Sequence, residues 1–171
     1  MLYTGRAVIM ALMQSDPASP VPLGEAYERV RSASDLTPEV ALVLGSGLGP
    51  LAEEIEGATV IPYSEIPGMV RSTAPGHAGR LILGTLAGRR VVAMQGRMHL
   101  YDGVSARQVA FPVRLMRELG AGTLLVSNAC GGMVDSWQAG DLMLQLDFIN
   151  ATGDNALIGP NDDERGPRFP V

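Results

Sequence analysis

Residues Val40–Gly49 have the sequence VALVLGSGLG, a short apolar run that stops at a glycine-rich loop. A continuous apolar run of this length, bounded by a turn signal, predicts a buried strand. We expect a helix to begin within Leu48–Ile55, directly after the loop. A strand, a tight glycine turn and a helix N-terminus together present free backbone N–H groups, which suit an anion. The stretch therefore predicts an α/β fold with an anion-binding loop at the end of a strand.

Four more strands are predicted along the chain. Two strand-like runs, Arg80–Leu86 and Arg89–Met94, are joined by Ala87-Gly88, which is the spacing of a β-hairpin. Farther along, Thr123–Ser127 predicts another buried strand and Leu142–Ile149 a further one.

Two amphipathic helices are predicted between the strands. The first covers about residues 23–34. The second begins at Ser105, where a glutamine three residues on forms a capping box, and runs to about Leu119, with Gly120 as its stop. Pro112 should kink this helix or end its first part. Because strands and helices alternate and one pair forms a hairpin, the predicted fold class is α/β, a mixed central β-sheet flanked by helices.

Composition limits the kind of protein. A chain of 171 residues with 46% hydrophobic and 18% charged residues is long enough for one globular domain. The net charge of −5 provides no basic field for nucleic acid or an anionic membrane. The single cysteine fits a reducing cytoplasm and excludes a cysteine-cluster metal site. We expect residues 1–22 to be an N-terminal extension and linker, and residues 23–171 to form one α/β domain that is incomplete, because it ends in a loop.

Both histidines of the chain lie in glycine-containing polar motifs. His77 is in PGHAGR, and His99 is in QGRMHLYDG, two residues after Arg97. With Ser46 these residues offer a hydroxyl, a guanidinium and two imidazoles, a donor set that suits a phosphate-sized anion. Each motif alone also fits a plainer interpretation, namely a chain reversal, a surface arginine or a structural histidine. The pairing of Arg97 and His99 directly after a predicted strand favours a ligand site. We expect no metal site, because no carboxylate lies at ligand spacing to either histidine.

The segment Asn128–Gly132, NACGG, closes another predicted strand. It fits either a turn with an ordinary buried cysteine or a loop whose backbone amides and Asn128 line a pocket. Cys130 lacks a further histidine to activate it, so we do not expect a cysteine nucleophile.

Taken in order, these motifs resemble the trimeric purine nucleoside phosphorylase family, over residues from about 23 to the end of the chain. The motifs that carry the resemblance are Gly45–Gly49, Arg71–Thr73, Pro75–Arg80, Gln95–Tyr101, Asn128–Gly132, Gly159–Asp162 and Arg168–Pro170.

The resemblance implies phosphorolysis. Inorganic phosphate, a co-substrate rather than a cofactor, would attack C1′ of a purine (deoxy)ribonucleoside and release the base and (deoxy)ribose 1-phosphate. No other cofactor is implied. The implied enzyme is a cytoplasmic homotrimer. Carried over by position, the phosphate ligands would be Ser46, His77, Arg97, His99 and the Ala129 amide, with Arg97 and His99 as the catalytic pair. Around the nucleoside, Tyr101 would lie near the ribose, Cys130 and Gly131 beside the base, Asn128 under that loop, and Phe169 in a neighbouring subunit's pocket.

Members of that family continue well past the position of Val171, and their base-recognising residues lie in that further part. We therefore expect this chain to bind phosphate weakly, to turn over inosine poorly, and to expose a sheet edge and an uncovered apolar face. Two alternatives stay open. One is a 5′-methylthioadenosine phosphorylase of the same fold, and the other is a non-catalytic phosphate-binding or assembly fragment.

Overall fold

The structure, a computed structural model, describes residues 23–70, 78–161, 163 and 166–168. Its centre is one mixed five-stranded sheet with the order β2-β3-β4-β1-β5. β1 lies between β4 and β5 and is parallel to both, whereas β2, β3 and β4 are antiparallel neighbours. The predicted mixed α/β sheet is therefore confirmed. The strands are β1 (Val40–Leu44), β2 (Glu56–Pro62), β3 (Arg80–Leu86), β4 (Arg89–Gln95) and β5 (Thr123–Val126).

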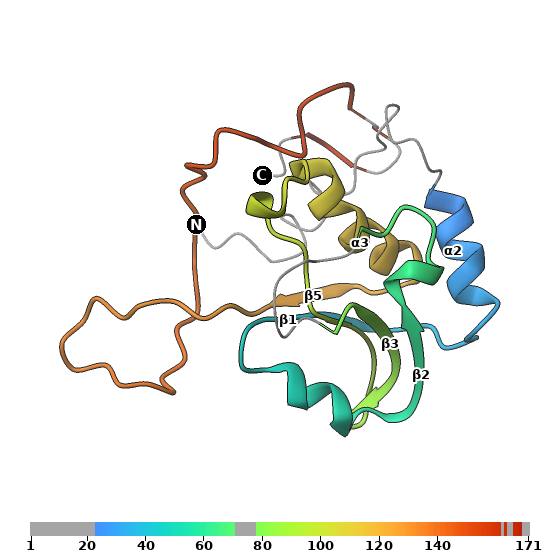
Figure 1. Ribbon diagram of the computed structural model, residues 1–171, viewed down its shortest axis with the longest axis horizontal. Helices are drawn as coiled ribbons and strands as arrows, with labels where there is room; N and C mark the ends of the chain where they lie inside the picture. Colours follow the sequence, from blue (N-terminus) through green and yellow to red (C-terminus); the bar gives the residue numbers. More distant parts are fainter. Residues whose placement is uncertain (1–22, 71–77, 162, 164–165, 169–171) are drawn as a thin grey trace.

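Two helices, α2 (Leu23–Arg31) and α3 (Ala106–Glu118), lie together over one face of the sheet (Figure 1). The predicted capping box of α3 is confirmed, since the Ser105 side chain accepts a hydrogen bond from the backbone N–H of Gln108 and the Gln108 side chain accepts one from the backbone N–H of Ser105. The chain also forms three short 3₁₀ helices, η1 (Gly49–Glu54), η2 (Tyr63–Glu65) and η3 (Leu100–Asp102).

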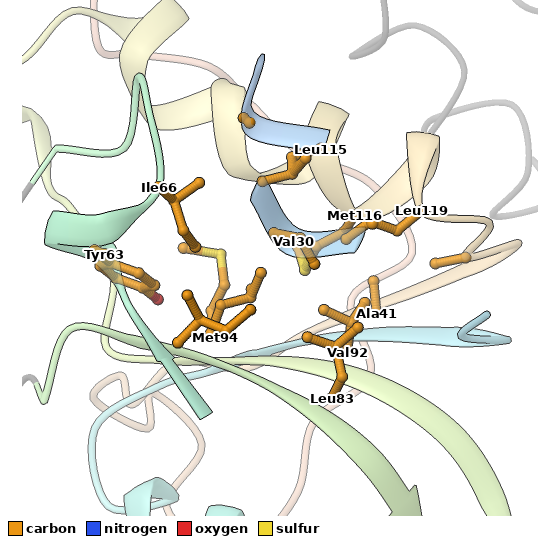
Figure 2. Packing of buried hydrophobic residues seen from close by; sticks show 14 of the residues in the cluster. Val30, Ala41, Tyr63, Ile66, Leu83, Val92, Met94, Leu115, Met116 and Leu119 are labelled. Atoms are coloured by element: carbon orange, nitrogen blue, oxygen red, sulfur yellow. The ribbon is translucent and has the colours of Figure 1, made fainter. Parts of the chain in front are cut away.

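The core has two parts because successive side chains of a strand point to opposite faces of the sheet. Ala41 and Val43 of β1 face α2 and α3 and join the larger cluster, which Figure 2 shows with Val92, Met94 and Leu115. The alternate residues of β1 pack on the other face with residues of η1, in the smaller cluster of Leu42, Leu44, Ala52, Ile55, Ile82, Val91 and Ala93. Burial of β1 on both faces agrees with the continuous apolar run of its sequence.

Several predicted elements have different bounds or a different form. The helix expected within Leu48–Ile55 is the 3₁₀ helix η1, which has a proline in its first turn. The first helix ends at Arg31, three residues before the expected end. Pro112 does not end α3, which continues unbroken from Ala106 to Glu118. Pro112 is itself fully buried, so packing of its ring in the core offsets the missing backbone hydrogen bond.

One strand prediction was wrong in part, one was wrong altogether, and one strand was missed. Thr123–Ser127 does contain β5, but this strand is at the sheet edge and is mostly exposed rather than buried. Leu142–Ile149 forms no strand, and its side chains are exposed. β2 was not predicted, because Glu56–Thr59 lacks an apolar alternation. In the structure the pairing of this part of β2 with β3 is irregular.

After β5 the chain runs away from the sheet in a wide loop, drawn in orange in Figure 1. Large apolar side chains are exposed along this loop. Among the described residues β5 is an edge strand, as the expected exposed sheet edge requires. None of the helices among the described residues has the length and apolar character that crossing a membrane requires. The predicted extension over residues 1–22 lies outside the described residues.

Candidate functional site

Three loops meet at the end of the sheet where strands β1, β4 and β5 finish. They follow β1 (Gly45–Leu48), β4 (Gly96–His99) and β5 (Ser127–Gly132). Because β1 is parallel to both β4 and β5, the carboxyl ends of all three strands lie at the same edge. In α/β sheets this edge is where ligands bind.

The loops after β1 and β5 are in direct contact through Gly45. Its backbone N–H donates to Ser127 Oγ at 2.9 Å, and that hydroxyl donates to the carbonyl of Val43 at 3.1 Å. A Cβ atom added to Gly45 would lie 2.3 Å from the backbone oxygen of Ser127 and 2.9 Å from the Cα of Asn128. Only glycine fits this approach without a shift of backbone. Ser46, the next residue, is exposed beside this contact.

Arg97 links the loop after β4 to the same place. Its Nη1 donates to the backbone carbonyl of Ser127 at 2.9 Å, and the residue is half-buried. A guanidinium held by a backbone carbonyl has fewer orientations to lose when an anion binds. The structure therefore brings Arg97, the Gly45-Ser46 turn and the end of β5 to one point.

Tyr63 fixes the turn that precedes Arg97. Its hydroxyl, in the buried core, donates to the carbonyl of Gly96 at 2.7 Å. Burial raises the pKa of Tyr63 above its ordinary value, so the hydroxyl keeps its proton and remains a donor. The backbone N–H of Tyr63 donates to the carbonyl of Gly79, and the Gly79 N–H donates to the carbonyl of Gln95. The segment that follows His77 is thus tied to the start of the Arg97 loop.

Gln95 holds the far end of the glycine loop. Its side chain is buried, and Nε2 donates to the carbonyl of Gly49 at 2.9 Å. Its Oε1 accepts a hydrogen bond from Nε of Arg80, also at 2.9 Å. A buried side-chain amide is favourable where its N–H and its oxygen both have hydrogen-bond partners, and both groups of Gln95 have one. Gln95 therefore couples β3 and β4 to the loop after β1.

His99 and Tyr101 lie at the other end of the β4 loop. Their rings stack with centroids 4.6 Å apart and planes 9° from parallel. The backbone N–H of His99 donates to Asp102 Oδ2 at 2.9 Å, which fixes the start of η3. Tyr101 is 76% exposed, so its ring lies on the solvent side of the His99 ring.

The remaining predicted site residues lie beyond β5 or outside the described residues. Asn128, Ala129, Cys130 and Gly131 are exposed, and the Asn128 amide donates to the carbonyl of Ala129. The alternative of an ordinary buried cysteine is wrong, because Cys130 is exposed. His77 and Phe169 lie outside the described residues.

The sequence did not identify three of the residues that build this site. Ser127, Tyr63 and Gln95 make its connecting hydrogen bonds. Ser127 and Gln95 had a usable signal, a polar side chain at the carboxyl end of an apolar run, whereas the burial of Tyr63 depends on tertiary packing. Among the described residues, no three His, Cys, Asp or Glu side chains gather so as to hold a metal ion.

The site joins a glycine loop, an arginine and a strand-end loop at the carboxyl edge of a mixed sheet, an arrangement suited to phosphate-dependent chemistry. The family model of the phosphorylase superfamily matches residues 39–171, and the chain belongs to this superfamily.

The relatives that the chain resembles are purine nucleoside phosphorylases. It is 51% identical over 146 residues to purine nucleoside phosphorylase 1 of Geobacillus stearothermophilus, covering 85% of this chain and 53% of the relative. It is 49% identical to the purine nucleoside phosphorylase of Bos taurus, covering 82% of this chain and 50% of the relative. The Schistosoma purine nucleoside phosphorylase solved in complex with hypoxanthine superposes with a TM-score of 0.80 at 40% identity, covering 92% of this chain and 56% of that one. The chain thus spans about half the length of these relatives.

Proposed function

We propose that this chain carries the phosphate-binding half of a purine nucleoside phosphorylase, which uses inorganic phosphate to cleave purine (deoxy)ribonucleosides to the free base and (deoxy)ribose 1-phosphate. The relatives at 49% and 51% identity carry that name. Solved Schistosoma relatives hold hypoxanthine, inosine, or ribose-1-phosphate together with cytosine. The observation that carries the proposal is the junction at Ser127, whose carbonyl accepts from Arg97 and whose hydroxyl accepts from Gly45.

The chemistry needs a dianion held in a fixed position. Phosphate is a weak nucleophile, and the sugar develops positive charge at C1′ as the base departs. A phosphate held beneath the ribose therefore acts as nucleophile and as electrostatic stabiliser. In this proposal Arg97 offsets part of its charge, Arg97 and His99 orient it, and Ser46, His77 and the amide of Ala129 donate the remaining hydrogen bonds.

The nucleoside would lie over the exposed residues beyond β5. Tyr101 would flank the ribose, and Cys130 and Gly131 would lie beside the base with Asn128 supporting their loop. By the same resemblance, Phe169 would reach a neighbouring subunit within a homotrimer. The single cysteine of the chain fits a reducing compartment, so the proposed location is the cytoplasm.

Phosphate binding by the 171-residue chain tests the proposal most directly, with titration calorimetry as the measurement. Arg97→Gln removes the charged donor and should weaken binding by at least about tenfold, since a hydrogen bond to a charged group contributes roughly 1.5–3 kcal/mol. Arg89→Gln is the matched control, because Arg89 is exposed in the hairpin at the opposite end of β4. Equal affinities for the two variants, or no binding by the parent chain, would contradict the proposal.

Turnover is measured separately, as release of hypoxanthine from inosine with and without phosphate. Because the chain spans about half of its relatives, we expect slow or undetectable turnover by this chain alone. Rapid phosphate-dependent release would show that base recognition needs no residues other than these 171.

A second candidate function is a non-catalytic phosphate-binding or assembly fragment. The observation that favours it is the long exposed apolar segment after β5, a surface suited to contact with another chain. Phosphate binding without turnover, together with mixed oligomers formed with the full-length G. stearothermophilus relative, would support it. Absence of mixed oligomers would exclude the assembly role.

A further inference from the structure

The glycine loop after β1 is held at its two ends and is open between them. Its first amide, that of Gly45, donates to Ser127 Oγ at 2.9 Å. Its last carbonyl, that of Gly49, accepts from Gln95 Nε2 at the same distance. Between these anchors the Ser46 side chain is exposed, and a Cβ added to the glycine that follows it would meet no atom within 4 Å. Because few contacts hold the middle of the loop, the hydrogen bonds at its two ends set the position of Ser46.

The amide of Gln95 can face this loop in only one way, because Arg80 decides its orientation. An arginine side chain is a donor only, so the oxygen of the amide must face Arg80 Nε, which lies 2.9 Å from it. The nitrogen of the amide is thereby directed at the carbonyl of Gly49, which is an acceptor only. A turned amide would place two donors together at Arg80 and two acceptors together at Gly49.

Gln95 also adjoins the loop that carries Arg97. It is the last residue of β4, and the chain continues through one glycine into Arg97. Gln95 is 8% exposed, and in the register of the sheet it lies beside Leu44, the last residue of β1. One buried residue therefore connects the two loops from which the proposed site takes Ser46 and Arg97.

We infer that Gln95, oriented by Arg80, is a positioning residue of the phosphate site, one that sets the Ser46 hydroxyl at a fixed distance from the Arg97 guanidinium. Gln95 and Arg80 act through the glycine loop rather than by contact with the anion. The inference rests on the proposed function, which takes Ser46 and Arg97 as ligands of phosphate. Without the hydrogen bond to the loop, Ser46 would occupy several positions, and the apparent affinity would fall with the fraction of molecules in the suitable one.

Gln95→Met tests the inference, with inorganic phosphate and titration calorimetry as the measurement. Methionine has a similar length but neither the donor nor the acceptor of the amide. We expect it to weaken phosphate binding about fivefold, the change that corresponds to loss of one hydrogen bond. Arg31→Met is the matched control, because Arg31 donates to the carbonyls of Leu36 and Leu119, where the end of α2 meets the end of α3. The control should lower the urea midpoint and leave the affinity for phosphate unchanged.

A double-mutant cycle with Arg80→Met tests the step through which Arg80 acts. In the parent chain this substitution frees the amide to turn, and it should weaken phosphate binding by about twofold, since only one of the two amide orientations suits the loop. In the Gln95→Met chain it should have no further effect, because no amide is left to orient. Equal effects in both backgrounds would indicate the lost charge alone and would overturn the role given to Arg80. Unchanged binding by Arg80→Met alone would refute the inference even where Gln95→Met did not fold.

Amide hydrogen exchange gives a readout that needs no phosphate. The N–H of Leu48 donates to the carbonyl of Gly45 and closes the glycine loop. Its exchange should be faster in Gln95→Met than in the parent chain and unchanged in Arg31→Met. If Arg97→Gln weakens phosphate binding and Gln95→Met does not, or if the exchange of Leu48 is unchanged, Gln95 has no positioning role and the proposed function stands. No phosphate binding by the parent chain would overturn both.

Discussion

Gly45→Ala is the substitution that most directly tests the junction of the three loops. The glycine lies where the loop after β1 passes the backbone of Ser127 and Asn128. The added Cβ would be 2.3 Å from the oxygen and 2.8 Å from the carbon of the Ser127 carbonyl. Both atoms belong to backbone, which cannot turn aside as the end of a flexible side chain can. The substitution must therefore move the end of β5 away from β1.

The expected cost has two parts. Overpacking of a tight site costs about 1–3 kcal/mol, and a forced backbone shift is at the upper end of that range. The shift also lengthens the hydrogen bond from Gly45 N to Ser127 Oγ, now 2.9 Å, which contributes about 1 kcal/mol. We expect a loss of about 2–4 kcal/mol in the free energy of unfolding.

Urea denaturation measures this loss, with Gly49→Ala as the matched control. Gly49 is the first residue of η1, directly after the same loop, has no atom within 4 Å of an added Cβ and has no positive φ. Both variants lose the same freedom in the unfolded chain, so their difference isolates the close approach. With a slope of about 2 kcal/mol per molar urea, the midpoint of Gly45→Ala should be roughly 1–2 M below that of Gly49→Ala. Coincident midpoints would refute the reasoning.

Three further predictions concern groups around the site. Tyr63→Phe should lower the free energy of unfolding by about 1–3 kcal/mol, because the carbonyl of Gly96 loses its buried donor; an unchanged urea midpoint would contradict this. Ser105→Ala should cost about 1 kcal/mol by removing the cap of α3, and thermal melting by circular dichroism would show no shift if the cap were unimportant. Hydrogen bonds from the backbone N–H of Ala106 and from the backbone N–H of Asn155 hold the pKa of Asp154 below its ordinary value of 3.8. The contribution of Asp154 to stability is therefore complete above pH 3.8 and is lost as the pH falls through the lower pKa of the folded state. Asp154→Asn should flatten the dependence of the free energy of unfolding on pH below about pH 4. If that dependence were the same in the variant as in the parent chain, this role of Asp154 would be excluded.

Local sequence predicted the elements whose signals are short-range. The hairpin β3–β4 turns at Ala87 and Gly88, which both have positive φ, so two adjacent residues determine the reversal. The start of α3 at Ser105 likewise depends on side chains within one turn. The glycine loop and Arg97 could be proposed as an anion site because both follow apolar runs.

Pairing between distant strands could not be predicted in this way. The bounds of β5 were nearly right, but its exposure was not, because a short apolar run such as Leu124–Val126 gives the same sequence signal in an edge strand as in a central strand. Leu142–Ile149 shows the same limit, since a strand needs a partner for its backbone groups as well as a suitable composition.

The sequence by itself predicted the α/β fold class, the hairpin, the two helices and a set of donors suited to phosphate, because capping, turn formation and hydrophobic periodicity act over a few residues. Only the tertiary structure decided that β1 lies between β4 and β5, that Gly45, Arg97 and Ser127 meet, and that Tyr63 and Gln95 hold them there. These contacts join residues more than thirty positions apart in most cases, and which of them form depends on the parallel order of the strands rather than on any local pattern.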